Sequence, residues 1–157
     1  MRRIALSFLM VFSTIATADP WVVVDDLQGT IPQAPRVNYD SRNEQLCKGD
    51  PRKSIDVTDE ALTDAGWLLW DETQRDGDVA IRIVAAGQAG QCRPVGISII
   101  VFSGGLPVAA YQPAAITENL AGELRSGYLH LSQTYPKPGE GLCCGTGKRA
   151  MVVRLEP

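Results

Sequence analysis

Hydrophobic and polar residues alternate along two segments of the chain, as is typical of β-strands with one face on a core. In residues 79–84 a large aliphatic side chain occupies every second position, and residues 128–135 (YLHLSQTY) alternate in the same way. Residues 97–102 form a run of β-branched and aromatic side chains, followed by Ser-Gly-Gly and a second apolar segment at 106–111. This order predicts a β-hairpin.

Three shorter apolar segments predict further strands, at residues 21–24, 67–70 and 150–155. Between them, residues 114–125 are ambiguous. Ile116, Leu120 and Leu124 recur every four residues, which favours a helix, whereas Gly122 opposes one.

A helix is predicted over residues 57–65 (VTDEALTDA). Thr58 is the expected N-cap, and Asp59 and Glu60 lie in the first turn, where the helix dipole favours negative charge. Gly66 is expected to end the helix. These elements together predict an α+β domain, mainly an antiparallel β-sheet with one or two short helices.

The first 18 residues are typical of a cleaved export signal. Arg2 and Arg3 are followed by an apolar run at 4–15 and by the small-residue site Ala-Thr-Ala at 16–18. The run is too short to span a bilayer. We therefore expect a secreted or periplasmic protein that begins at Asp19 and has no stable membrane anchor. We expect its residues 19–54 to form an irregular arm.

The charge of the chain argues against nucleic-acid binding. The formal net charge is −3, and removal of the signal, which holds two arginines and no acidic residue, makes it more negative still. A mildly acidic chain with scattered basic residues lacks the concentrated positive charge that nucleic acid attracts.

Four cysteines follow the signal: Cys47, Cys92, Cys143 and Cys144. In an oxidising compartment an even number of cysteines predicts disulfides. A bond between the adjacent pair would close a strained ring, so we expect Cys47 and Cys92 each to pair with one member of the doublet; which member stays open. A soft metal site that includes His130 is less favoured, because adjacent cysteines lack the usual gap between zinc ligands. No metal or other cofactor is expected.

His130 is the only histidine, and the alternation of its strand places it on one face with Tyr128 and Ser132. A catalytic role would need a nucleophile and an orienting acid nearby, which no motif identifies. Lys148 and Arg149 are weak candidates for contacts with a small anion.

Residues 55–155 carry short motifs in a fixed order, namely LTDAGWL at 62–68, QCRPVG at 91–96, VF at 101–102 before the glycine turn, Pro113, and LCCG at 142–145. This order resembles the LppP/LprE-like envelope lipoprotein domain family. The resemblance implies a single domain over about residues 55–157 in a bacterial cell envelope, and implies no reaction. Family lipoproteins carry a lipid-accepting cysteine directly after the signal, whereas Asp19 follows here, so a lipid anchor is not expected.

These observations favour a noncatalytic binding or structural module that meets an envelope protein or a glycan. An exported enzyme with His130 near its site is the alternative. A deep cleft with convergent polar groups around His130 would favour the enzyme, and a flat exposed apolar or aromatic patch would favour the binding module.

Overall fold

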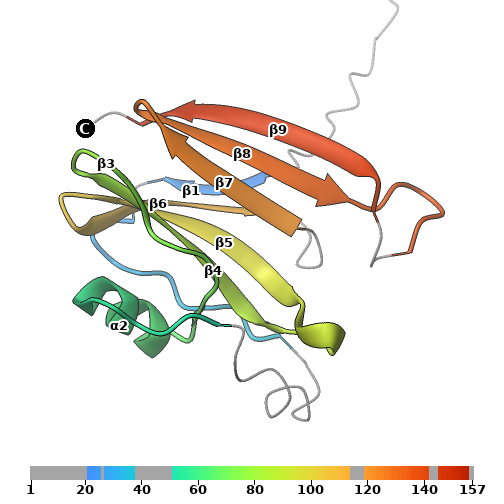
Figure 1. Cartoon of the computed structure of the whole chain (residues 1–157), viewed down its shortest axis with the longest axis horizontal. Helices are drawn as coiled ribbons and strands as arrows, with labels where there is room; N and C mark the ends of the chain where they lie inside the picture. Colours follow the sequence, from blue (N-terminus) through green and yellow to red (C-terminus); the bar gives the residue numbers. More distant parts are fainter. Residues whose placement is uncertain (1–20, 26, 38–50, 114–118, 142–144, 156–157) are drawn as a thin grey trace, which may run out of the picture.

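The computed structural model describes residues 21–25, 27–37, 51–113, 119–141 and 145–155, arranged in three layers (Figure 1). A six-stranded sheet lies in the middle, a three-stranded sheet covers one of its faces, and a short helix covers part of the other. In chain order the elements are β1 (Trp21–Asp25), α2 (Val57–Asp64), β2 (Leu68–Leu69), β3 (Gln74–Asp76), β4 (Val79–Gln88), η1 (Gly90–Cys92), β5 (Pro94–Ser103), β6 (Leu106–Pro113), β7 (Asn119–Arg125), β8 (Tyr128–Tyr135) and β9 (Gly147–Arg154).

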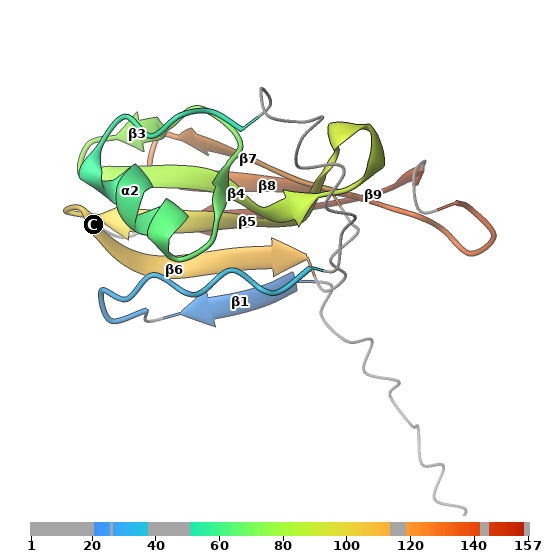
Figure 2. The ribbon, with the colours of Figure 1, turned by 90° about the horizontal axis from the view of Figure 1, so that it is seen from below.

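All strand pairs in both sheets are antiparallel. The large sheet has the order β1-β6-β5-β4-β2, with β3 also paired to β4, and the small sheet has the order β7-β8-β9. The prediction of a mainly antiparallel sheet with a short helix is confirmed. Seen from the helix side, α2 lies over β4 and β5, and residues 27–37 run beside it over β6 and β1 (Figure 2).

The central strands β4 and β5 are buried on both faces. One face packs against the small sheet through Ile81, Ile99 and Leu129, all fully buried. The opposite face packs against α2 through Leu62 and Val84. The expectation that the strand at 79–84 has a single core face was therefore wrong, because α2 covers the second face.

The helix begins two residues earlier than an N-cap at Thr58 would place it. Asp56 is the N-cap, and its carboxylate accepts a hydrogen bond of 2.9 Å from the Asp59 N–H. Helix α2 ends at Asp64, and Gly66 follows in a left-handed conformation with φ of 86°, as predicted for a helix stop. Since two turns are marginal in isolation, the buried Leu62 and the contacts of Asp59 must hold the helix in place.

Strand β4 continues to Gln88, with Gly87 and Gln88 paired to β5, and residues 89–93, which include η1, connect the two strands. The described part of 114–125 is strand β7, not helix. A spacing of four residues also equals two pleats of a strand, so Leu120 and Leu124 share the inner face of β7.

Candidate binding face

The outer face of the small sheet brings together two of the predicted site residues, His130 and Lys148. In β8, Leu129 and Leu131 are buried against the large sheet, whereas Tyr128, His130 and Ser132 are exposed. The predicted shared face of these three residues is confirmed. Because β7 and β9 pair with β8 on either side, their outward side chains complete rows across the sheet.

Four rows cross the face from β7 through β8 to β9. They are Asn119–Thr134–Lys148, Ala121–Ser132–Ala150, Glu123–His130–Val152 and Arg125–Tyr128–Arg154. The second row holds only small side chains between two rows of larger ones, so it forms the floor of a shallow groove. Two adjoining hollows of about 340 and 290 Å³ lie along this floor and share Ala121 and Ser132.

The groove face carries more cations than anions. Arg125 and Arg154 flank the exposed Tyr128, and Lys148 lies near the other end of the groove. Over the described residues, none of these three cations has an ion-pair partner. Glu123 is the acidic side chain in the rows, so the face is positive in a chain that is acidic as a whole.

His130 lies on this face opposite Glu123 and two residues from Ser132. Within the described part of the chain, it makes no hydrogen bond or ion pair that would orient its ring. The hollow beside it is open and is lined by Glu123, Ser132 and Met151 as well as by two alanines and Val152. Among the described residues, His130, Glu123 and Ser132 lie on one face without hydrogen bonds between them.

Lys148 and Arg149 differ in their surroundings. Lys148 is exposed on the groove face, whereas Arg149 is partly buried and its guanidinium stacks on the Tyr135 ring at 3.7 Å. Both residues line the same hollow, and their contact with one anion stays a prediction. The Tyr135 ring also packs closely on Gly147, where a side chain would collide with it.

The β8–β9 loop is held by Glu140. Its carboxylate accepts hydrogen bonds from the Thr146 hydroxyl and from the backbone N–H groups of Thr146 and Lys137. These bonds, led by that from the Thr146 hydroxyl, lower the pKa of Glu140 to about 2.

Of the candidate disulfide residues, the structure describes only Cys92, which is half-buried in η1 with φ of 56°. Cys47, Cys143 and Cys144 lie outside the described residues. The described ranges contain no group of three or more His, Cys, Asp or Glu side chains arranged to hold a metal ion.

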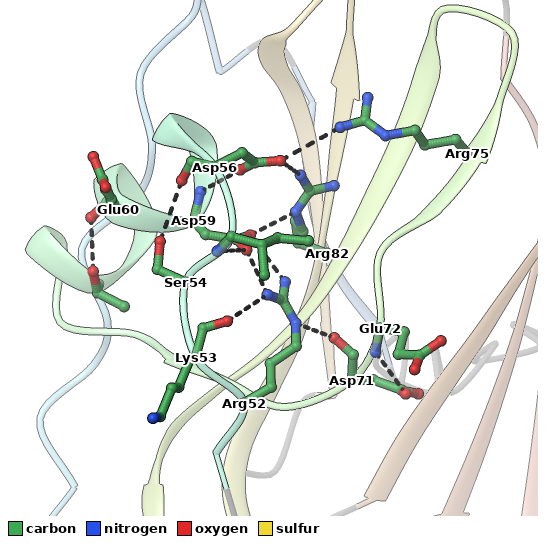
Figure 3. Close-up of polar contacts among 12 residues, drawn as sticks. Arg52, Lys53, Ser54, Asp56, Asp59, Glu60, Asp71, Glu72, Arg75 and Arg82 are labelled. Carbon is green, nitrogen blue, oxygen red and sulfur yellow. Dashed lines mark hydrogen bonds and ion pairs between the residues drawn. The ribbon is translucent and has the colours of Figure 1, made fainter.

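A buried ion-pair network, which the sequence did not predict, joins α2 to the large sheet (Figure 3). Arg82 of β4 is 1 % exposed and donates from Nε to Asp59 and from Nη2 to the N-cap Asp56, both at 2.8 Å. Arg52 donates from both terminal nitrogens to the Asp59 carboxylate, and its Nε donates to the Asp71 carbonyl. Asp59 is fully buried.

Charge and hydrogen bonding in this network oppose the effect of burial. Burial raises the pKa of Asp59, but hydrogen bonds from Arg52, Arg82 and the Ile55 N–H together hold it well below the usual range of a carboxyl. The hydrogen bond to Asp59 raises the pKa of Arg52. The Phe102 ring, whose centroid lies 5.8 Å from the Arg82 guanidinium carbon, is a further favourable neighbour.

A second set of polar contacts fastens the two sheets together at the free edge of β7. The Gln74 side chain donates to the Gly122 carbonyl and accepts from the Leu124 N–H, at 2.9 and 2.8 Å. Asp76 accepts from the Gly127 N–H at 2.6 Å. These bonds fasten the edge of the small sheet to the large sheet behind it.

The described residues include no helix long and apolar enough to cross a membrane. Comparisons with protein-family models, with curated proteins and with solved structures find no match to this chain. The resemblance to the LppP/LprE-like family therefore stays a prediction.

Proposed function

We propose that this protein is an exported, noncatalytic binding module of the bacterial cell envelope, and that the outer face of β7-β8-β9 is its contact surface. The observation that carries this proposal is an open groove with Lys148 in its lining, on a face whose Arg125, Lys148 and Arg154 have no ion-pair partner among the described residues. The sheet is fastened to the large sheet from behind. Such a preformed surface loses little conformational entropy when a partner binds. The partner is an envelope protein or a glycan.

The compartment and the family belong to the same proposal. The basic, apolar and small-residue segments of the first 18 residues support export. The ordered motifs of residues 55–155 support membership of the LppP/LprE-like family. Export in turn favours disulfides, and Cys92 is the candidate cysteine that the structure describes. We expect it to pair with one cysteine of the doublet, which would close a loop of about 50 residues and add about 4 kcal/mol.

An exported enzyme with His130 near its site is the second reading. His130, Glu123 and Ser132 share one face, which is the observation in its favour. The shallow groove and the absence of hydrogen bonds among these residues in the described structure favour binding over catalysis.

Filling the groove tests the proposed function. Ser132→Trp places a bulky side chain on the exposed floor, in a strand position where an aromatic residue is well tolerated. Glu60→Trp places the same side chain on the exposed surface of α2, away from the groove, and is the matched control. Purified variants are incubated with isolated envelope fractions, and the retained protein is measured.

We expect Ser132→Trp to lose retention while Glu60→Trp and the unmodified protein keep it. Equal retention of the two variants would refute the groove face as the contact surface. Absence of retention of the unmodified protein would refute the binding module itself.

A further inference from the structure

We infer that the groove face binds an oligosaccharide whose sugar rings carry carboxylates. This inference rests on the proposed function and names the class of ligand for the same face. It follows from the charge of the face, the kind of polar groups that it exposes, and the distances between its cations.

Charge selects an anionic ligand. Arg125, Lys148 and Arg154 are exposed and have no ion-pair partner within the described structure. In contrast, Arg52, Arg75 and Arg82 all pair with Asp56 or Asp59. Among the described residues of the four rows, these three cations outnumber the one glutamate, so the face is complementary to negative charge.

The spacing of the cations selects an extended ligand. Strands lie about 4.8 Å apart, so Arg125 on β7 and Arg154 on β9 are separated by about 10 Å across the sheet. Lys148 lies three rows from Arg154 along β9, which is about 20 Å. A single small anion cannot reach all three cations, whereas a chain with repeated anionic groups can.

The exposed polar groups select a sugar over a peptide. The backbone of β8 is hydrogen-bonded to both neighbours, so the groove floor offers hydroxyl, amide and imidazole side chains; these side chains are Asn119, His130, Ser132 and Thr134. An acidic peptide that adds as a strand would pair with the outer edge of β9, beside the groove floor and not on it. Sugar hydroxyls pair with such side chains, and the ring of Tyr128, a residue 42 % exposed, offers a flat surface for a sugar ring.

Titration with tetragalacturonate tests the inference, with maltotetraose as the neutral sugar and tetraglutamate as the acidic peptide. Backbone amide NMR shifts locate binding, and the same titrations give the affinity. We expect tetragalacturonate to shift the amides of Ala121, Ser132 and Ala150. We expect its affinity to fall as salt rises from about 0.1 to about 1 M, because screening shortens the reach of surface charges.

A double variant that removes two of the positive charges sharpens the test. Arg125→Gln with Arg154→Gln should weaken tetragalacturonate binding about three- to tenfold, at the strength typical of exposed charge pairs. Arg36→Gln with Lys53→Gln removes the same charge from exposed positions outside the groove rows and should leave the affinity unchanged.

Absence of tetragalacturonate binding at millimolar concentration would overturn the inference, as would maltotetraose binding equally well or both double variants weakening it equally. Binding of tetraglutamate on this face without tetragalacturonate would overturn the glycan and leave the proposed function standing. If Ser132→Trp also keeps full envelope retention, the proposed function fails as well.

Discussion

Substitution of Asp59 by Asn should destabilise the protein far more than substitution of Arg82 by Met. Asp59 is fully buried and receives hydrogen bonds from both Arg52 and Arg82. Loss of its charge leaves the guanidinium of Arg82, which is 1 % exposed, with only the half-buried Asp56 as a counter-ion. Removal of one partner of a buried pair costs about 3–5 kcal/mol.

Arg82→Met has a smaller expected cost because the carboxylate of Asp59 keeps its other donors. Arg52 still binds it through two nitrogens, and the Ile55 N–H still donates at 3.1 Å. Arg82 Nη1 has no hydrogen-bond partner among the described residues, so its burial is already a cost to the native protein. Methionine also fills similar space beside Phe102. We expect a loss of about 1–2 kcal/mol.

Urea unfolding of the oxidised protein measures both changes. With a slope of about 2 kcal/mol per molar urea, Asp59→Asn should lower the midpoint by about 1.5–2.5 M, and Arg82→Met by less than about 1 M. Lys53→Gln, which neutralises an exposed cation nearby, is the control and should leave the midpoint unchanged. Equal losses from Asp59→Asn and Arg82→Met would refute the reasoning that Asp59 is the centre of the network.

Three further predictions follow from the same structure. The free energy of unfolding should fall as pH drops below about 4, because the hydrogen bonds that lower the pKa of Asp59 stabilise the folded state only while its carboxylate is charged. Measured by urea unfolding at several acidic pH values, this free energy should depend less on pH in Asp59→Asn. Gly122→Ala should lower the free energy of unfolding by about 1–3 kcal/mol, since the added methyl group would collide with the fully buried Ile99. Thermal melting measures this loss, and Ala121→Ser on the exposed face is the control that should leave the melting temperature almost unchanged. Intact mass of the exported protein, alkylated without reduction, should correspond to a chain that begins at Asp19 with no alkylated thiol; a retained signal or a labelled cysteine would contradict the export and disulfide proposals.

The strands that alternate were the most predictable part of the fold. The predicted segment 128–135 is β8 itself, with His130 on the expected face, because a half-buried strand next to solvent shows its two faces directly in the sequence. Strand β7 was ambiguous, because Leu120 and Leu124 fit both a helical turn and a pair of pleats.

The buried network could not be predicted, because it depends on a layer that the local sequence does not show. Arg82 alternates with aliphatic residues, which indicated a solvent-facing side chain. It is buried because α2 covers that face and brings Asp56 and Asp59 to it. The same contact accompanies the cap, since the Asp56 carboxylate accepts hydrogen bonds from the Asp59 N–H and from Arg82.

The groove could not be predicted from the sequence for a similar reason. Ala121, Ser132 and Ala150 are unremarkable in sequence and are far apart in the chain. They form a floor only because the registers of β7 and β9 against β8 align them in one row. Register depends on which strands pair, so the face could be predicted for β8 alone.

Site-specific photo-crosslinking in the exporting cell tests the central claim most directly. A photoreactive phenylalanine analogue replaces Ala121 on the groove floor, or Glu60 on α2 as the control, and both residues are exposed. We predict one defined adduct with an envelope component from position 121 and none from position 60. Adducts from position 60 alone, or the same adduct from both positions, would contradict the assignment of the β7-β8-β9 face as the contact surface.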